Sequence, residues 1–182
     1  MAAMDRTFTI VVNPAAGGGT AHRCLQAVRA VLDAAGVRYL AQDSKSLIDA
    51  GRLAAEAAAR GDHVVAVGGD GMAGAIAAAV ARAKPAGDGL FAIIPAGRGN
   101  DLARSYGIPF SPDGAARLLL DGQSRPMDLI EVTGADGTRA TAAGSLTCDR
   151  SMPAGADGES LGISFPLRIQ VIPAALKITA PR

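Results

Sequence analysis

The stretch TFTIVVNPAAGGGTAHRCLQAVRAVLDAAG, residues 7–36, decides the fold of this chain. Its first six residues are all β-branched or aromatic, which predicts a short strand, and the NPAAGGG that follows predicts a glycine-rich loop. Thr20 can cap a helix that ends at Gly36. One face of that helix carries recurring apolar residues: Leu25, Val28, Val31 and Leu32. The stretch therefore predicts one unit of strand, glycine loop and helix.

The same unit recurs twice along the chain. The second copy has an apolar strand at 63–67, the turn GGDG at 68–71 and an alanine-rich helix at 72–83. The third copy has a strand at 90–94, the loop PAGRGND and a helical turn at 101–106. The other elements predicted in this part are a strand at 37–40 and helices at 48–60 and 112–120. Parallel strands bring such loops to one carboxyl edge, so we expect an α/β fold with an open parallel sheet and a ligand site at that edge.

The pattern becomes β-rich near residue 125. The predicted strands lie at 127–132, 138–142, 163–171 and 176–178, and TGADG joins the first two as a hairpin. The segment 144–162 lacks periodicity, and a structureless connection of that length indicates that an expected part is absent. We therefore divide the chain into a domain at 1–125 and an incomplete β-rich domain at 126–182.

Composition narrows the function classes. The 182 residues include 39 alanines within an apolar fraction of 49%, so the predicted core is thin and closely spaced. The net charge of +1 argues against a nucleic-acid binder. Cys24 and Cys148 lack the spacing of a zinc site or a disulfide framework. The sequence has no pattern of a signal peptide or membrane span, so we expect a cytoplasmic protein, with a peripheral position at the inner membrane face as a further expectation.

The three loops carry the predicted chemistry. Glycine turns at strand ends let backbone N–H groups approach an anion, so phosphate is the expected ligand. The chain has neither GxxxxGK followed by Ser or Thr nor GxGxxG, which argues against a Walker A site and a Rossmann dehydrogenase. Asp70 either meets a cation, orients a bound group or is a turn aspartate. Asn100 and Asp101 fit a helix cap and a ligand contact equally well, and Arg98 and Arg104 fit phosphate pairing or plain solvation.

Three motifs carry a resemblance to a known family: NPAAGGG at 13–19, VAVGGDG at 65–71 and PAGRGNDLAR at 95–104. In this order and spacing they resemble the diacylglycerol kinase-like lipid kinases over the first 125 residues. The resemblance implies ATP and Mg²⁺ as cofactors, with Asp70 as the metal position. The nucleotide contacts that it implies are Asn13, Pro14, Gly17, Gly18, Ser44, Gly68, Gly69, Asp70, Gly71, Met72, Gly97, Arg98, Asn100 and Asp101. A nicotinamide dinucleotide kinase of the wider GGDG group is the weaker alternative, because PAGRGNDLAR points to lipid kinases.

The resemblance extends in two pieces to the family's second domain, a β-sandwich that closes over the lipid. Residues 125–144 resemble its beginning and 156–181 its end, so this part is expected to be a truncated β-sandwich remnant. Asp157 matches the family's proton acceptor, and Glu159 lies beside it as a second catalytic candidate. The implied function is transfer of the ATP γ-phosphate to a lipid hydroxyl, with diacylglycerol giving phosphatidic acid. The alternative is a shortened homologue that binds nucleotide without turnover.

Four residues depart from the family pattern, and one of them is Arg98, which stands where Thr is frequent. The GGDG turn is commonly followed by a hydroxyl residue and then by Asn and Glu, and this chain has Met72, Gly74 and Ala75 at those places. The detailed geometry of the nucleotide and metal contacts is therefore expected to differ from the family's.

The expected partners are a lipid substrate at a membrane surface and a second copy of the chain. Exposed strand edges in the remnant favour the homodimer. After Glu159 the chain carries three basic and no acidic side chains: Arg168, Lys177 and Arg182. This balance fits an anionic membrane surface, and it also fits an ordinary solvated strand face.

Overall fold

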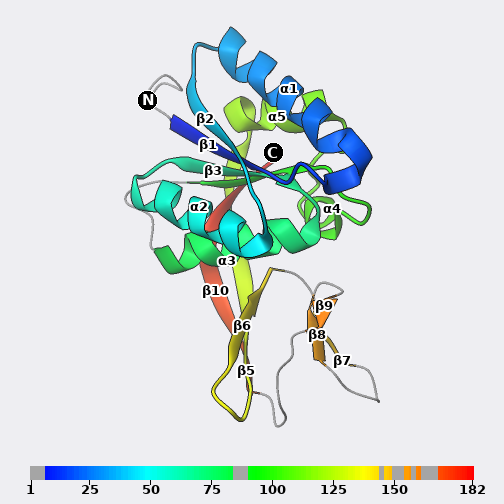
Figure 1. Cartoon of the computed structure of the whole chain (residues 1–182). Coiled ribbons are helices and arrows are strands. Elements are labelled where there is room, and N and C mark those ends of the chain that lie inside the picture. Colours follow the sequence, from blue (N-terminus) through cyan, green and yellow to red (C-terminus); the bar gives the residue numbers. More distant parts are fainter. Residues whose placement is uncertain (1–6, 84–89, 144–145, 149–153, 157–158, 161–167) are drawn as a thin grey trace.

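The computed structural model describes residues 7–83, 90–143, 146–148, 154–156, 159–160 and 168–182. Most strands form one seven-stranded sheet in the order β2-β1-β3-β4-β10-β5-β6 (Figure 1). Its members are β1 (Thr7–Val12), β2 (Arg38–Asp43), β3 (His63–Gly68), β4 (Phe91–Pro95), β5 (Gln123–Thr133), β6 (Arg139–Ala142) and β10 (Arg168–Ala180). A separate antiparallel sheet contains β7 (Leu146–Cys148), β8 (Ala154–Ala156) and β9 (Glu159–Ser160).

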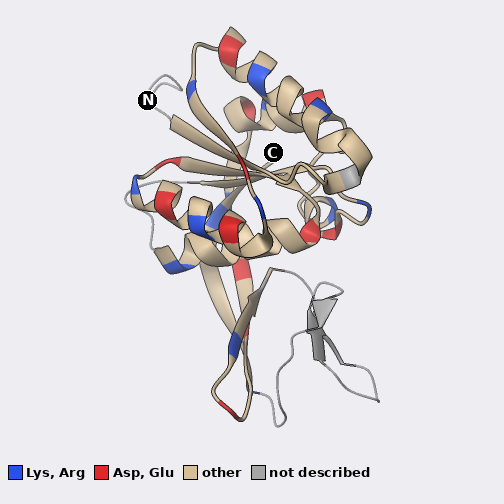
Figure 2. Cartoon of the chain, viewed as in Figure 1, with Lys and Arg blue, Asp and Glu red and all other residues tan. Residues whose placement is uncertain are grey.

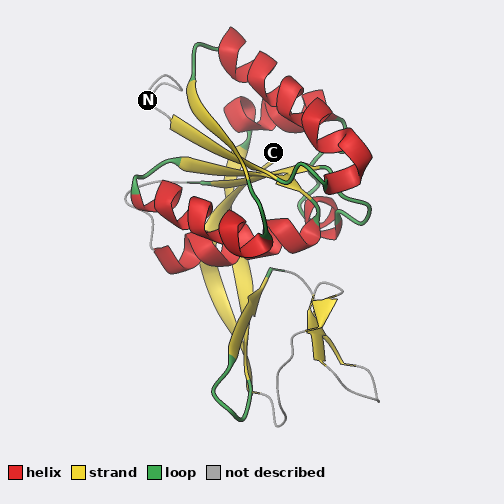
Figure 3. Cartoon of the chain, in the orientation of Figure 1, coloured by secondary structure: helices red, strands yellow, loops and turns green. Residues whose placement is uncertain are grey.

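Helices cover both faces of the parallel part of the large sheet (Figure 3). On one face α1 (Thr20–Ala34) packs against α5 (Pro112–Asp121), and on the other α2 (Leu47–Ala59) packs against α3 (Asp70–Ala83). The short 3-10 helix η2 (Ala16–Gly19) precedes α1, and α4 (Asp101–Ser105) follows β4. β1 runs parallel to β2 and β3, and β3 runs parallel to β4. The predicted α/β fold with repeated strand, loop and helix units is confirmed.

The alanine content allows the helices to approach the sheet and one another closely. Alanine supplies four of the five buried residues of α2, and the fifth is Leu53. Where Gly51 of α2 faces α3, an added Cβ would lie 3.7 Å from the Cβ of Ala79, at ordinary van der Waals distance. Among the residues whose side chains the structure describes, Lys, Arg, Asp and Glu lie on the helices, on the loops and on β2, β5, β6 and β10, whereas β1, β3 and β4 carry none of them (Figure 2). Small buried side chains thus bring α2 close to α3, in agreement with the closely spaced core that the composition predicts.

β10 differs from its sequence prediction. Two strands separated by Pro173 were expected, but one strand runs through this position with a register shift after Ile172. The shift is anchored because the backbone N–H of Ala174 donates to Oδ1 of Asp128 on β5 at 2.7 Å. Proline has no N–H to lose from the ladder, so it is tolerated at such an irregularity. The expected strand residues 163–167 lie outside the described part of the chain.

The large sheet is mixed rather than parallel throughout, which corrects the expected open parallel sheet. β10 pairs in parallel with β4 through Ile178 and Phe91, and it pairs antiparallel with β5 along most of its length. The β-rich part thus continues the same sheet through β10, β5 and β6. The β-sandwich origin of this part and the domain boundary after residue 125 stay predictions.

Two local expectations are also corrected. The segment 144–162 is not structureless, because its described residues include the three short strands β7, β8 and β9. The N-cap of α1 is Gly19 and not Thr20, which is the first helical residue. Gly19 has a φ of 100°, a left-handed conformation that glycine adopts without steric cost.

Candidate functional site

The three glycine loops meet at the carboxyl edge of β1, β3 and β4. The backbone N–H of Asn13 donates to the carbonyl of Val67 at 3.1 Å, which ties the first loop to β3. The backbone N–H of Ala96 donates to the carbonyl of Gly68 at 2.8 Å, which ties the third loop to the same strand. The prediction of a shared loop edge is therefore confirmed.

The second and third loops touch through two glycines. A Cβ added to Gly97 would lie 2.5 Å from the Cα of Gly69, and one added to Gly69 would lie 3.2 Å from the Cα of Gly97. Real Cβ atoms do not approach backbone as closely as the first of these distances. Glycine is thus required at Gly97 by the packing of two backbones, independently of any ligand.

Asp70 links these two loops from the first turn of α3. Its Oδ1 accepts a hydrogen bond from the backbone N–H of Leu102 at 3.1 Å, so it satisfies a free donor of α4. Its Oδ2 faces Gly99, where an added Cβ would lie 2.9 Å from this oxygen and 3.7 Å from Oδ2 of Asp101. Within the described residues, no three His, Cys, Asp or Glu side chains form a metal cluster. Asp70 is therefore a cap for α4 with one oxygen still facing the loop edge.

Asn100 closes the third loop on itself. Its Oδ1 accepts from the backbone N–H of Gly97 at 3.0 Å, and its Nδ2 donates to the carbonyl of Gly97 at 2.9 Å. It occupies the N-cap position of α4 with a φ of 56°, but its side chain makes no capping hydrogen bond. The sequence is equally consistent with Asn100 as a helix cap and as a ligand contact. In the structure its side chain has a third role, because its two hydrogen bonds to Gly97 shape the loop.

We expect Asn100→Ala to lower the free energy of unfolding by about 1–2 kcal/mol, because it removes two partly buried hydrogen bonds. Alanine is also strained at this positive φ, so Asn100→Gly is the matched control that removes the same bonds without the strain. Urea unfolding of the three proteins measures both contributions. Wild-type stability in Asn100→Gly would show that the bonds to Gly97 contribute nothing.

The first loop is shaped by Asn13 and by its glycines. Oδ1 of Asn13 accepts from the backbone N–H of Ala15 at 3.0 Å, and Pro14 is exposed at the turn. Gly17 and Gly18 lie in η2, and Gly18 has a φ of 59°. Gly18 and Gly19, two consecutive residues with positive φ, therefore connect this loop to α1.

Ser44 and Met72 support the loops from within the protein. Ser44 is buried, and its hydroxyl donates to the carbonyl of Val12 at 3.0 Å, so it ties the start of the first loop to the segment after β2. The Met72 side chain is buried beneath Gly68, where an added Cβ would lie 2.7 Å from its Sδ. Gly71 is half-buried in the first turn of α3. These side chains pack and bond inside the protein, which the sequence patterns did not reveal.

The arginines of the third loop differ in their surroundings. Arg98 is exposed at the tip of the loop. Arg104 pairs with Asp101, donates to the carbonyl of Gly99 at 3.3 Å and lies over the ring of Phe110 at 5.3 Å from its centroid. Arg104 is therefore a bracing residue of this loop, and Arg98 is the arginine whose charge faces solvent at the loop edge.

Burial affects two titratable side chains near the loops. Burial raises the pKa of the Cys24 thiol, with a smaller opposing effect of Arg23, and its Sγ lies 3.8 Å from the carbonyl of Pro95. Burial also raises the pKa of Tyr106, and the charge of Asp128 adds to this effect. Both groups are therefore held in their neutral forms and act as packing residues.

The side chains of the two catalytic candidates, Asp157 and Glu159, lie outside the described part of the structure. Asp157 lies outside the described residues. Glu159 begins β9, of which only the backbone is described. Their catalytic roles stay predictions.

The sequence family described as diacylglycerol kinase catalytic domain matches residues 7–132. The chain belongs to this family. A protein of Pseudomonas aeruginosa named "Probable lipid kinase YegS-like" is 38% identical over 131 residues, which cover 71% of this chain and 41% of that protein. The diacylglycerol kinase of Mycobacterium tuberculosis is 34% identical over 153 residues, which cover 79% of this chain and 48% of that protein.

A solved structure shares the fold of this diacylglycerol kinase family member. It is a diacylglycerol kinase from Bacillus anthracis str. Sterne, with a TM-score of 0.62 and 29% identity over 74% of this chain and 47% of that chain. The chain thus spans less than half the length of these relatives. Among the described helices, each is too short or too polar to span a bilayer.

Proposed function

We propose that the chain is an ATP-dependent lipid kinase that acts at a membrane surface and phosphorylates a lipid hydroxyl, with diacylglycerol as the substrate and phosphatidic acid as the product. The observation that supports this most directly is the contact of Gly69 with Gly97 beside Asp70, within a member of the diacylglycerol kinase family. Kinases of this family use ATP. Two loops joined through glycine backbone leave no Cβ atoms between a phosphate chain and the backbone N–H groups.

The surrounding loop edge fits a nucleoside triphosphate. Gly18 and Gly19 have φ values of 59° and 100°, which let consecutive N–H groups turn toward an anion. α1 and α3 both begin at this edge, and the positive ends of their dipoles favour phosphate. Arg98 adds an exposed positive charge. Mg²⁺ binds through one or two carboxylates together with substrate phosphates, and we assign Oδ2 of Asp70 to it.

ATP supplies the transferred phosphoryl group, and Mg²⁺ neutralises its charge. In the proposed reaction the lipid hydroxyl oxygen bonds to the γ-phosphorus while the bond from that phosphorus to the bridging oxygen of ADP breaks. The carboxylate of Asp157 accepts the hydroxyl proton. The loop residues contribute by positioning the phosphates. Asp70 joins α3 to the start of α4, and Asn100 holds the third loop in shape.

Nucleotide binding without turnover is the second candidate function. It is favoured by the extent of the family match, which ends at residue 132. A kinase needs a lipid site and a proton acceptor in addition to a nucleotide site. The nucleotide loops lie within the matched region at 7–132, whereas Asp157 does not.

Thermal unfolding with ATP and Mg²⁺ tests the nucleotide site that both candidates share. At a ligand concentration 100-fold above Kd we expect stabilisation of about 2.7 kcal/mol. This corresponds to a rise in Tm of about 5–10 °C for a chain of this size. Formation of phosphatidic acid from radiolabelled ATP then separates the candidates. Stabilisation without product would favour the non-catalytic protein, and the absence of both would contradict both candidates.

We infer that β10 provides the homodimer contact expected from the sequence. Residues 168–172 pair with β5 on one side, and within the described residues no strand pairs with their other side. Ile169 and Val171 are 52% and 60% exposed on one face. In an antiparallel pair centred on Gln170, Ile169 would face the partner's Val171, so the apolar residues would cover each other.

Val171→Lys is therefore expected to convert a dimer into a monomer, because it places like charge and a solvated side chain in this contact. Light scattering during size-exclusion chromatography measures the change. Ile48→Lys is the matched control, since Ile48 is an apolar residue that is 87% exposed and belongs to α2 rather than to β10. A wild-type protein that is monomeric at all concentrations would rule out the contact, as would equal dissociation by the control.

A further inference from the structure

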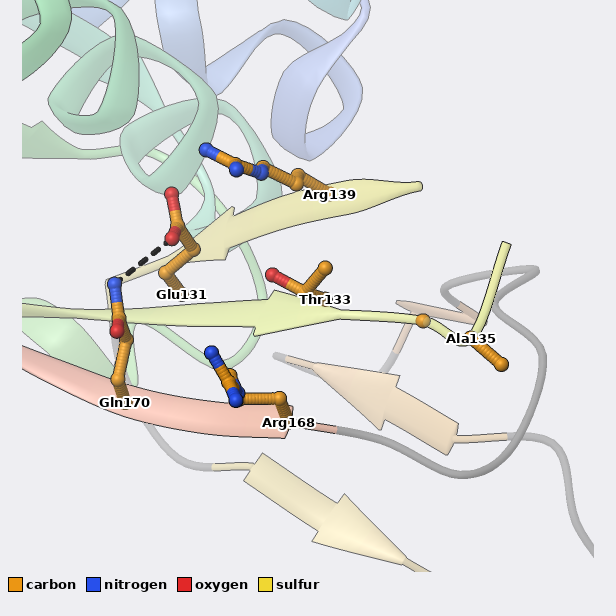
Figure 4. Close-up of a pocket in the computed structure, with 7 residues that line it drawn as sticks. Glu131, Thr133, Ala135, Arg139, Arg168 and Gln170 are labelled. Carbon is orange, nitrogen blue, oxygen red and sulfur yellow. Dashed lines mark hydrogen bonds between the residues drawn. The ribbon is translucent and has the colours of Figure 1, made fainter. Parts of the chain in front are cut away.

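A pocket of about 480 Å³ lies on the polar face of the ribbon formed by β6, β5 and β10 (Figure 4). The strand register places three of its residues in one row. Thr133 of β5 is opposite Arg139 of β6 on one side and opposite Arg168 of β10 on the other. Neighbouring strands lie about 4.8 Å apart, so the two arginine backbones are separated by about 10 Å with the threonine between them.

The acidic residue of the pocket, Glu131, is hydrogen-bonded to another lining residue. Glu131 lies two residues before Thr133 on the same face, and its Oε1 accepts from Nε2 of Gln170 at 2.9 Å (Figure 4). Within the described residues, the ion pairs of this protein involve neither Arg139 nor Arg168. Both arginines are exposed, so their guanidinium groups are accessible at the pocket.

The pocket lining carries two positive charges, from Arg139 and Arg168, and one negative charge, from Glu131, so its net charge is positive. The two guanidinium groups lie on the same face of the ribbon, on either side of Thr133, and repel each other weakly. An anion bound between the two arginines would attract both guanidinium groups and offset their mutual repulsion. Guanidinium groups match phosphate oxygens through paired N–H donors, and the Thr133 hydroxyl would supply a third donor between them.

We propose that Arg139, Thr133 and Arg168 form a binding site for a phosphate group, separate from the glycine loops. The group is either free phosphate or the phosphodiester of an anionic phospholipid headgroup, which present the same oxygens to the row. The site shares no residue with the proposed nucleotide site, so it does not depend on the proposed kinase activity.

Binding measured with the full chain tests the proposal in two arms. In the first arm the protein is sedimented with phosphatidylglycerol-containing vesicles and with vesicles of phosphatidylcholine alone. In the second arm inorganic phosphate is titrated while amide NMR shifts of the ribbon are followed. The variants are Arg139→Gln, Arg168→Gln and Thr133→Val, which removes the hydroxyl without changing charge. Arg117→Gln is the matched control, because Arg117 is an exposed arginine on α5.

We expect Arg139→Gln and Arg168→Gln each to weaken binding on the order of fivefold, as for loss of one cation at an anionic surface. Thr133→Val is expected to weaken binding by a smaller factor, and Arg117→Gln should leave it unchanged. Vesicle binding without phosphate binding would identify the headgroup as the source, and the reverse would identify free phosphate. The proposal is overturned if neither arm shows binding, if Arg117→Gln weakens binding as much as Arg139→Gln, or if Thr133→Val has no effect. A loss of binding in Arg117→Gln, or unchanged binding in Thr133→Val, would indicate diffuse attraction to positive charge rather than a site.

Discussion

Replacing Asp157 by asparagine is expected to lower the rate of phosphatidic acid formation by about 10²- to 10⁴-fold, with little change in ATP affinity. This is the usual contribution of a positioned general base. Asparagine has nearly the same shape as aspartate but cannot accept the proton of the attacking hydroxyl. The nucleotide loops lie in the first part of the chain and do not include this residue, so ATP binding and turnover should separate in this variant.

The measurement uses radiolabelled ATP and diacylglycerol in mixed micelles, with thermal unfolding in ATP and Mg²⁺ as the binding readout. Glu159→Gln is the matched control, because it removes a carboxylate two residues away. Asp157 is assigned as the base if Asp157→Asn loses turnover and Glu159→Gln retains it. Equal phosphatidic acid yields from Asp157→Asn and the wild type would remove Asp157 from the mechanism, and a loss confined to Glu159→Gln would transfer the role to Glu159.

Gly97→Ala is expected to destabilise the protein by about 1–3 kcal/mol and to abolish ATP-dependent stabilisation. The added Cβ would lie 2.5 Å from the Cα of Gly69 and 3.1 Å from Oδ1 of Asn100, so the second and third loops must separate. Overpacking of this kind costs about 1–3 kcal/mol when backbone has to move. Separation would also withdraw Asp70 from the backbone N–H of Leu102, which it holds at 3.1 Å.

Gly51→Ala is the matched control for this variant. Gly51 lies inside α2, and an added Cβ would meet Ala79 at an ordinary 3.7 Å, so alanine should stabilise the helix by up to about 1 kcal/mol. Calorimetric unfolding with and without ATP and Mg²⁺ compares the two variants. If Gly97→Ala unfolds like the wild type and retains the ATP response, close contact of the two loops is not needed for nucleotide binding.

Much of the candidate site could be predicted from sequence because its signals are local. Glycines directly after buried strands predicted the three loops, and the alanine-rich helices between them predicted a closely packed α/β sheet. The roles of particular side chains were not predictable in the same way. Asp70 caps a helix that begins 31 positions further along, and the hydroxyl of Ser44 bonds to a carbonyl 32 positions earlier.

The sequence also did not predict on which side of the backbone a motif side chain lies. Met72 follows the GGDG turn directly, yet its side chain lies beneath Gly68 and not at the loop edge. Position in a motif does not say on which side of the backbone a side chain falls. Only the packing of α3 on the sheet decides that the methionine is buried.

Taken alone, the amino-acid sequence determined the order of the strands, loops and helices up to α5, because apolar periodicity and glycine placement act over a few neighbouring residues. Tertiary structure decided that β10 returns to pair with both β4 and β5 and that Asp128 binds the backbone N–H of Ala174, 46 positions further along, at the irregularity of β10. It also decided that Arg139, Thr133 and Arg168 share one row. These features join distant parts of the chain, and their partners become neighbours only when the whole sheet has formed.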